Sequence, residues 1–495
     1  MHAVALAIIF STLPTQTVAN DTPASMAAQI DELLNTEVLS GAKVGVYIKR
    51  LNDGRELYTR NADTFFIPAS NIKLITSAAA LHYFGPSYRF LTEVYFLPNG
   101  ESKQSGDIII KGNGDPLFTY ERAWYLASRI YYAGIRTIGN IIVDDSFFPG
   151  PHMANGWKED HSDYAYMAPN GAVSVGFNTV LIHVQPNSIP GALARVIVEP
   201  TSNYVTLDNA ATTVSRRRTR LSIDVVEQGK RSRVRVSGRI NMRDSGRAYY
   251  RRITNPPIYA GEAIKAMLQQ FGIKVYKSVS VGLTPPDATR LTSVGSPTLT
   301  EIIYKLNKHS NNFMAEQLAL ALGAARFGAP GSWSKSQSAF DDFLINEVGL
   351  QSGSYRISNA SGLHSVNSMT PRQIAAVLEF MYHNSQIAPE FISSLAVAGA
   401  SGTLSERMRT TEASRLLRAK TGTLSISSAL SGYVPTRNGD TLVFSLLVND
   451  YQSPVSEVWQ VQNKIGALMA RMRFLNTPES MAEATSTEVR EVAIP

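Results

Sequence analysis

The most informative stretch of this sequence is PASNIK at residues 68–73, followed by the helix-favouring run TSAAAL at residues 76–81. A proline and small residues before good helix formers predict that Ser70 lies at or near a helix N-terminus. Ser70 and Lys73 then share one face of that helix, one turn apart. A serine hydroxyl is a weak nucleophile until a base takes its proton, and a lysine can act as that base when its pKa is lowered.

By itself a Ser-x-x-Lys tetrapeptide recurs by chance in long chains and marks only an ordinary helix start. Two later stretches raise its weight, namely Ser310-Asn311-Asn312 and KTGT at residues 420–423. Ser-x-x-Lys, Ser-x-Asn and Lys-Thr-Gly in this order are the motif set of penicillin-recognising serine enzymes. Each motif alone is weak, whereas the ordered set is a specific indication of that class.

Length and composition narrow the class of protein. The chain has 495 residues, enough for two or three domains, and a net charge of +7 that favours anionic partners without naming one. It contains no cysteine, which excludes disulfides, zinc thiolate sites and cysteine nucleophiles.

Asp144 and Asp145 are two adjacent carboxylates that could suggest a metal site. They have no histidine or further carboxylate nearby in the sequence, so they predict a capped turn. We expect neither a metal nor another cofactor.

Residues 1–19 have the length of a secretory signal peptide, with an apolar run at 3–10 and small residues before a cut after Ala19. No Lys or Arg precedes Lys43, so the usual positive start is missing, and the alternative is a buried N-terminal helix. No other run approaches the roughly 20 apolar residues that span a bilayer. We therefore expect a periplasmic protein with no integral membrane segment in the mature chain. Residues 476–495 lack periodicity and predict a flexible tail.

Hydrophobic periodicity predicts an α/β multi-domain chain. Residues 25–92 and 292–475 are expected to form one discontinuous domain, in which strands from both ends of the chain share a sheet backed by the terminal helices. Ser310 falls at the junction of two predicted helices, 298–307 and 312–324. Residues 93–167 and 250–291 predict an inserted α/β domain, in which 107–144 is a strand–helix–strand unit with parallel pairing. Residues 168–249 predict a second inserted domain, basic and β-rich, with separate short strands at 233–236 and 239–242.

The inserted β-rich part is strongly basic. Between Arg216 and Arg252 there are 13 Lys and Arg against three acidic residues, a net charge of +10 that exceeds that of the whole chain. Arg233 and Arg235 alternate with valines, so they are expected to leave one face of a strand. This surface is either a solvated outer face or a footprint for an anionic polymer or lipid surface. Nucleic acid is not an expected partner, because the arginines lack interleaved aromatic residues.

The motif set and its surroundings resemble the D-alanyl-D-alanine carboxypeptidase and endopeptidase family of the penicillin-binding protein 4 type, low-molecular-mass class C. The resemblance covers about residues 26–475 and includes a 237-residue gap between Lys73 and Ser310, which ordinary serine β-lactamases lack. The further matching motifs are Gly114-Asp115-Pro116, Val143-Asp144-Asp145-Ser146, Trp157, Asn178, Ser361-Gly362-Leu363, GASGTL at 399–404 and AKTGTL at 419–424. It implies a β-lactamase/transpeptidase-like domain, with an antiparallel sheet flanked by helices and a helical subdomain.

The resemblance also implies a reaction. Ser70 Oγ would attack the carbonyl between two D-alanines of a peptidoglycan stem peptide, and Lys73 would take its proton. The pKa of Lys73 would be lowered mainly by the second ammonium, Lys420, and by burial. Ser310 would pass a proton to the leaving amine, and Asn312 would orient Lys73 and bond the substrate amide. An acyl-enzyme would form and be hydrolysed, and β-lactam antibiotics would stall on the same path as covalent inhibitors.

Substrate binding is implied for the third motif and for Ser361. Lys420 with the hydroxyls of Thr421 and Thr423 would bind the terminal carboxylate, and Gly422 would let the substrate lie along the strand edge. The backbone N–H groups of Ser70 and Thr423 would form the oxyanion hole. Ser361 belongs to a stretch that borders the pocket for the stem-peptide side chain in the family.

That stretch departs from the family pattern. Residues 359–365 read NASGLHS where the family usually has DGSGLSR, so Ser365 stands in place of an arginine. Ser425 follows Leu424 where some members have a longer polar residue. These changes leave the stem-peptide preference open without affecting the reaction. His364 is expected to be a local polar residue rather than a catalytic base.

Three functions remain in view. The first is a DD-carboxypeptidase. A wider version of this hypothesis adds a DD-endopeptidase activity on cross-links. The second is a β-lactamase-like hydrolase, for which the sequence offers no recognisable extra glutamate to speed deacylation. The third is a non-catalytic cell-wall-binding or β-lactam-sensing protein. A pure binder has no need for the complete set of Ser70, Lys73, Ser310, Asn312 and Lys420, which favours an enzyme.

Overall fold

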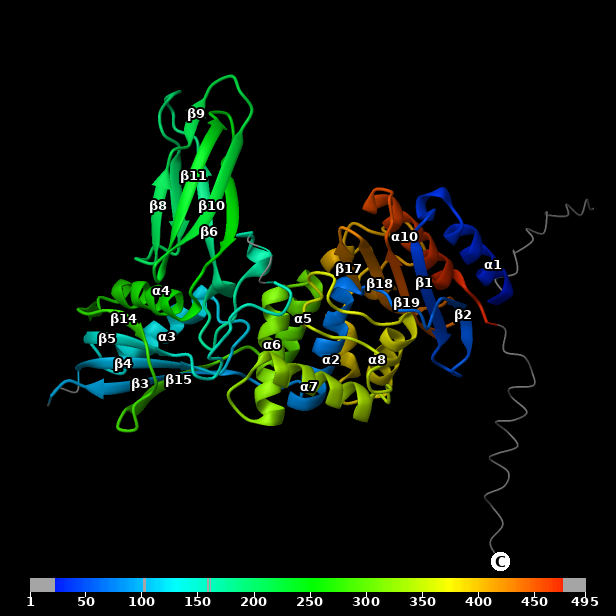
Figure 1. Cartoon of the computed structure of the whole chain (residues 1–495), viewed down its shortest axis with the longest axis horizontal. Coiled ribbons are helices and arrows are strands. Elements are labelled where there is room, and N and C mark those ends of the chain that lie inside the picture. Colours follow the sequence, from blue (N-terminus) through cyan, green and yellow to red (C-terminus); the bar gives the residue numbers. More distant parts are fainter. Residues whose placement is uncertain (1–22, 101–103, 158–159, 161, 475–495) are drawn as a thin grey trace, which may run out of the picture.

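The computed structural model describes residues 23–100, 104–157, 160 and 162–474. The predicted signal peptide at 1–19 and the predicted tail at 476–495 lie outside these residues. In Figure 1 the sheet that joins the two ends of the chain lies with its helices on the right. The chain between α2 (Ile72–Phe84) and α5 (Leu299–His309), here called the inserted region (residues 85–298), lies largely on the left. Within the described part of the chain, no helix is both long and apolar enough to cross a membrane.

The sheet that carries the third motif is antiparallel and joins the two ends of the chain. Its strand order is β16-β17-β18-β19-β1-β2. The N-terminal strand β1 pairs along its length with β19 near the C-terminus, from Lys43 opposite Asn449 to Arg50 opposite Leu442. The prediction that strands from both ends share one sheet is therefore confirmed. The strands are β1 (Lys43–Arg50), β2 (Glu56–Arg60), β16 (Ala396–Val397), β17 (Arg418–Leu424), β18 (Ser427–Pro435) and β19 (Thr441–Asn449).

Helices cover both faces of this sheet. One face packs against α1 (Pro23–Leu34) and α10 (Val455–Arg471), which share an apolar core with β1, β18 and β19. The other face packs against a helical cluster that surrounds α2, whose residues from Ile72 to Leu81 are all buried. The helices of this cluster are α2 (Ile72–Phe84), α5 (Leu299–His309), α6 (Asn312–Phe327), α7 (Trp333–Asp342), α8 (Pro371–His383) and α9 (Ala388–Ser394). A helix without a solvent face, such as α2, gives its side chains fixed positions.

One of the two parts of the inserted region is an α/β unit, formed by segments from the beginning and the end of that region. Its sheet has the order β13-β5-β4-β3-β15, with β14 also paired to β5. β4 and β5 are parallel and joined by α3, which confirms the predicted strand–helix–strand unit. The elements are β3 (Leu91–Pro98), β4 (Ser105–Gly112), α3 (Tyr120–Tyr132), β5 (Thr137–Asp144), α4 (Pro256–Gln270), β13 (Lys274–Val275), β14 (Val279–Val281) and β15 (Thr289–Gly295).

The second part is the basic β-rich module that stands above the α/β unit in Figure 1. It contains two sheets, one of order β12-β6-β7 and one in which β10, β8 and β9 all pair with β11. The strands are β6 (Thr179–Gln185), β7 (Arg195–Glu199), β8 (Val205–Asn209), β9 (Thr212–Val214), β10 (Arg220–Gln228), β11 (Arg231–Asn241) and β12 (Arg247–Arg252). Val234 and Val236 are buried while Arg235 is exposed, as the alternation predicts.

The prediction of separate strands at 233–236 and 239–242 is wrong, because residues 233–236 and 239–241 belong to the single strand β11 and Met242 lies just beyond its end. Gly238, which resembles a turn residue in the sequence, adopts a φ of 96° inside that strand. At this point β11 changes its parallel partner from β8 to β9, while β10 pairs along its whole length. The long partner β10 therefore holds the two segments in one strand.

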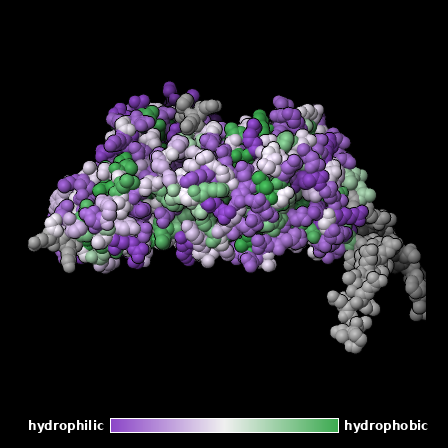
Figure 2. Space-filling view, turned by 60° about the horizontal axis from the view of Figure 1, so that its bottom comes forward, coloured by the Kyte–Doolittle hydropathy of each residue, from purple (hydrophilic) through white to green (hydrophobic). Residues whose placement is uncertain are grey.

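Short turns of helix complete the fold: η1 (Glu37–Leu39), η2 (Ala69–Asn71), η3 (Ala165–Met167), η4 (Gly176–Asn178), η5 (Phe343–Glu347) and η6 (Gly402–Leu404). Four of them, η2, η3, η4 and η6, lie beside the site described below. The face of the molecule in Figure 2 is mostly hydrophilic, with apolar residues in small separate patches.

Candidate active site

Ser70 lies in the turn η2 immediately before α2, which confirms its predicted place near a helix N-terminus. The turn is tightly held. Ala69 has a φ of 47°, in the left-handed region, and a Cβ built on Gly362 would lie 1.9 Å from the Ala69 carbonyl oxygen. Only a glycine at 362 lets this loop approach the turn so closely. The backbone of Ser70 is therefore positioned by packing on both sides.

Lys73, in the first turn of α2, is fully buried beside Ser70. Its Nζ lies 3.0 Å from Ser70 Oγ and 2.7 Å from Asn312 Oδ1, and it also donates to the backbone carbonyl of Ser361. The first and second sequence motifs thus meet at one amine, although 239 positions separate Lys73 from Asn312.

Lys420, on β17, is the second fully buried amine. Its Nζ donates to Ser310 Oγ at 2.8 Å and to the Thr421 carbonyl at 2.8 Å. Ser310 ends α5 with a φ of 54°, and Asn311 caps α6 by accepting a hydrogen bond from the Met314 N–H. The sharp turn between the two helices aims Ser310 at Lys420, which agrees with its predicted place at a helix junction.

Burial controls the electrostatics of both lysines. It lowers the pKa of Lys420 to about 7, because a charged ammonium is poorly solvated inside the protein. Burial is also the main cause that lowers the pKa of Lys73, and the positive charge of Lys420 adds to it. The sequence-based expectation ranked these two causes in the opposite order. The order found follows from the position of Lys73 on a helix without a solvent face.

Glu316 is a buried residue of this site that the sequence analysis missed. Its carboxylate accepts hydrogen bonds from the backbone N–H groups of Ala360 at 3.0 Å and Ser361 at 2.8 Å, and burial raises its pKa. The contact holds the 359–362 loop, whose Ser361 carbonyl faces Lys73. Glu316 lies one helical turn after Asn312 on α6, and this i, i+4 spacing was the available signal.

The third motif lies along an open strand edge. β16 pairs only with Arg418 and Ala419, so within the described chain the outer edge of β17 has no strand partner from Lys420 to Leu424. A Cβ built on Gly422 would lie 2.9 Å from the Pro68 carbonyl oxygen and 3.0 Å from Ser70 N. β17 therefore passes directly over the Ser70 turn. Thr423 is exposed, and Thr421 Oγ1 donates to Thr403 Oγ1 at 2.7 Å.

Ser361 and His364 lie on the loop that Glu316 holds through the backbone N–H groups of Ala360 and Ser361. Ser361 is fully buried, and its Oγ accepts a hydrogen bond from the Leu363 N–H at 3.2 Å. Its contact with the site is thus made by its carbonyl, and its predicted contact with substrate stays a prediction. His364, on the same loop, has a φ of 63°, and among the described residues it makes no hydrogen bond to Ser70 or to either buried lysine.

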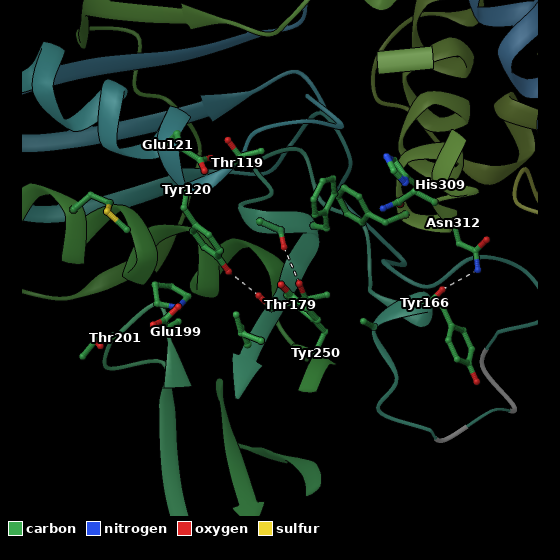
Figure 3. A pocket seen from close by; sticks show the side chains of 18 of the residues that line it. Thr119, Tyr120, Glu121, Tyr166, Thr179, Glu199, Thr201, Tyr250, His309 and Asn312 are labelled. Atoms are coloured by element: carbon green, nitrogen blue, oxygen red, sulfur yellow. Dashed lines mark hydrogen bonds between the residues drawn. The ribbon is translucent and has the colours of Figure 1, made fainter. Parts of the chain in front are cut away.

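A cavity of about 1050 Å³ opens beside Ser310 and Asn312 and extends into the inserted region. Figure 3 shows His309 and Asn312 on one side of it and Tyr120, Glu121 and Glu199 on the other. At the boundary Asn312 Nδ2 donates to the backbone carbonyl of Tyr166 at 3.1 Å. The inserted region therefore contributes an atom to the immediate surroundings of Lys73.

The sheet covered by helices on both faces, with a serine and two buried lysines at the strand edge, defines the class of penicillin-recognising serine enzymes. The chain belongs to the D-Ala-D-Ala carboxypeptidase 3 (S13) family, which it matches over residues 26–471.

Individual relatives agree with this assignment. The chain is 31% identical over 465 residues to a D-alanyl-D-alanine carboxypeptidase of Actinomadura sp. strain R39, covering 91% of this chain and 85% of that protein. Its structure is similar to penicillin binding protein 4 of Haemophilus influenzae, with a TM-score of 0.78, 22% identity and coverage of 89% and 99% of the two chains. It is more distantly similar to a predatory peptidoglycan endopeptidase of Bdellovibrio bacteriovorus, with a TM-score of 0.51, 18% identity and coverage of 86% and 92%.

Proposed function

We propose that this protein is a serine D-Ala-D-Ala carboxypeptidase that cleaves peptidoglycan stem peptides through an acyl-enzyme on Ser70. The observation that carries the proposal is the set of neighbours around Lys73 Nζ. Family membership supports the same activity.

A neutral lysine amine has two N–H donors and one lone pair. The Asn312 Oδ1 and the Ser361 carbonyl can only accept hydrogen bonds, so they take both donors. The lone pair is then left for the third neighbour, the Ser70 hydroxyl, 3.0 Å away. Burial and Lys420 both lower the pKa of Lys73, which favours this neutral form. Lys73 is in this proposal the general base that takes the Ser70 proton.

The bonds change in two stages. Ser70 Oγ forms a bond to the substrate carbonyl carbon while its proton moves to Lys73, and the C–N bond to the terminal D-alanine then breaks. Ser310, 2.8 Å from Lys420 Nζ, relays the proton held by Lys73: its hydroxyl gives a proton to the leaving amine and takes the one from Lys73 in exchange. In the second stage water attacks the acyl-enzyme, its hydroxyl group bonds to the acyl carbon, its proton passes through Lys73 to Ser70 Oγ, and the bond between Ser70 and the acyl group breaks.

Charge and strand geometry bind the substrate in this proposal. Lys420 in its protonated form, with Thr421 and Thr423, binds the terminal carboxylate. The substrate backbone pairs with the open edge of β17, where Gly422 has no side chain to obstruct it. The N–H groups of Ser70 and Thr423 form the oxyanion hole, worth roughly 3–4 kcal/mol per donor.

Three further points belong to the proposal. β-Lactam antibiotics acylate Ser70, cross-linked stem peptides are also cleaved by DD-endopeptidase activity, and the protein works in the periplasm after removal of a signal peptide. A β-lactamase-like function is less well supported, because Glu316 has both oxygens on backbone N–H groups and is fully buried. It is not placed to activate a water for deacylation.

Labelling with a fluorescent penicillin tests the proposal. We expect a covalent label on the wild type, none on Ser70→Ala or Lys73→Ala, and normal labelling of the exposed control Ser365→Ala. Release of D-alanine from a pentapeptide, compared with splitting of cross-linked dimers, then separates carboxypeptidase from endopeptidase activity. An unlabelled wild type, or equal label on Ser70→Ala, would show that the protein is not this enzyme.

A further inference from the structure

Of the residues that line the cavity beside Ser310 and Asn312, only these two take part in the reaction proposed above. Its volume of about 1050 Å³ is at the upper end of the range for pockets that hold small ligands. It is walled by the α5–α6 junction on one side and by α3, β6, β7 and β12 of the inserted region on the other. A ligand in this space would lie next to the groups that face the scissile bond.

The lining combines aromatic rings with carboxylates. Tyr120, Tyr166, Phe177 and Tyr250 line it from the inserted region, together with the carboxylates Glu121 and Glu199. Hydroxyl and amide groups are interspersed, and no Lys or Arg is among the lining residues that the structure describes. Such a lining repels a carboxylate-bearing ligand. It suits a neutral ligand with many hydroxyl groups, which donates hydrogen bonds to carboxylates and packs its C–H faces on aromatic rings.

Peptidoglycan contains both kinds of group: anionic stem peptides, and the neutral N-acetylated sugars of the glycan strand to which they are attached. We propose that this cavity binds N-acetylated sugar residues of the glycan strand while the attached stem peptide occupies the strand edge of β17. The inference rests on the proposed function, because it names the part of that substrate which lies outside the reacting peptide.

Two aromatic side chains have no role in the core. Tyr166 is 47% exposed and Tyr250 is 57% exposed, although both line the cavity. The Tyr166 ring stacks on Tyr164 with centroids 5.4 Å apart. Large exposed rings beside a cavity are typical of a binding surface.

The cavity is also rigidly built. Phe177 and Asn178 both have positive φ values, 59° and 52°, and this conformation is unfavourable for a bulky side chain such as that of Phe177. The Asn178 amide holds the turn through the Pro169 carbonyl and Ser174 Oγ, both at 2.8 Å. The turn places Phe177 edge-on to Phe313 of α6, with centroids 6.1 Å apart. A wall formed in advance reduces the conformational entropy lost on binding.

The test compares two substrates, a free pentapeptide and the same pentapeptide on its N-acetylglucosaminyl-N-acetylmuramyl disaccharide. We expect the wild type to show kcat/KM about tenfold higher for the disaccharide form, mainly through a lower KM. Tyr250→Ala and Glu199→Gln should lose most of that advantage and leave the free pentapeptide unchanged. Tyr276→Ala, which removes a ring that is 69% exposed and outside the cavity, should keep it.

Equal kcat/KM for the two substrates, or an equal loss on both in Tyr250→Ala, would overturn the inference while leaving the carboxypeptidase intact. A cross-linked peptide dimer without sugar that gains the same Tyr250-dependent advantage would assign the cavity to a second stem peptide instead. If neither substrate is hydrolysed, the proposed function fails.

A direct binding measurement decides the inference independently of activity. The probe is chitotetraose, a neutral N-acetylglucosamine oligomer, titrated calorimetrically into the wild type. We expect binding that Tyr250→Ala weakens about tenfold and Tyr276→Ala does not. Absence of binding to the wild type, or binding equal in Tyr250→Ala, would refute the sugar site.

Discussion

Asn312 Nδ2 donates a hydrogen bond to the backbone carbonyl of Tyr166 at 3.1 Å. Because a carbonyl can only accept, this contact fixes which way the Asn312 amide points and turns its Oδ1 toward Lys73 Nζ, 2.7 Å away. A residue of the inserted region thus orients the partner of the proposed base. The inserted region is therefore part of the active-site architecture as well as a neighbour of it.

Asn312→Asp should impair acylation in a pH-dependent way. An aspartate cannot donate to Tyr166, and its negative charge would raise the pKa of Lys73 by stabilising the ammonium form. We expect the rate of fluorescent penicillin labelling at neutral pH to fall about a hundredfold and to recover partly as the pH rises. Asn311→Asp is the matched control, since it adds the same charge and keeps a good N-cap for α6. A loss that does not depend on pH would contradict this account.

Lys420→Met should stabilise the protein while it abolishes carboxypeptidase activity. In the folded state burial lowers the pKa of Lys420 to about 7, whereas the unfolded lysine keeps its proton up to its ordinary pKa of 10.5. Between these values the unfolded state binds more protons, so this residue destabilises the fold at neutral pH and stops doing so above pH 10.5. Methionine removes the buried amine, so we expect the free energy of unfolding at neutral pH to rise by about 2 kcal/mol.

Melting curves at pH 7 and above pH 10 measure this effect. Lys420→Met should melt at a higher temperature than the wild type, and this difference in melting temperature should be largest at pH 7 and smaller above pH 10. Lys464→Met, at an exposed position on α10, should show neither effect. A destabilised Lys420→Met at both pH values would show that the hydrogen bonds of Lys420 outweigh its burial.

The pH profile of kcat/KM should be bell-shaped for a substrate with a free terminal carboxylate. Activity should fall at low pH as Lys73 becomes protonated and loses its lone pair. It should also fall above about pH 7, where Lys420 in the free enzyme loses the charge that binds the carboxylate. The same peptide with a C-terminal amide should lack the alkaline fall. An alkaline fall of equal size for both peptides would assign it to another group.

Gly422→Ala should block acylation. The added methyl group would lie 2.9 Å from the Pro68 carbonyl oxygen and 3.0 Å from Ser70 N, which is closer than a Cβ normally approaches. It would occupy the space beside a proposed oxyanion donor, so we expect a loss of at least about a hundredfold in the labelling rate. Ser425→Ala, at an exposed position just beyond β17, is the control and should label normally. Normal labelling of Gly422→Ala would mean that β17 can move away from the Ser70 turn.

The main helices and strands of this chain can be predicted from its sequence. The helix-favouring run after Ser70 predicts α2, and the predicted helices 298–307 and 312–324 correspond to α5 and α6. The discontinuous sheet follows from alternating apolar segments near both ends. These features depend on neighbouring side chains and backbone propensities, and those are properties of the sequence itself.

Other features of the site depend on backbone atoms and on buried side chains, and no sequence motif identifies these. The Ser361 and Tyr166 carbonyls carry no side-chain signature, and Glu316 resembles any helical glutamate until the fold buries it. The merger of 233–236 and 239–241 into β11 was decided by pairing with β10, which a single segment cannot reveal.

The residue types, their helix and strand settings and the order of three motifs were determined by the sequence alone. The tertiary structure decided that Lys73 and Lys420 lose their solvent, that their hydroxyl partners lie within hydrogen-bonding distance, and that a cavity opens between α6 and the inserted region. Desolvation and distance arise only when segments hundreds of positions apart pack together, and they control the acidity of the two amines.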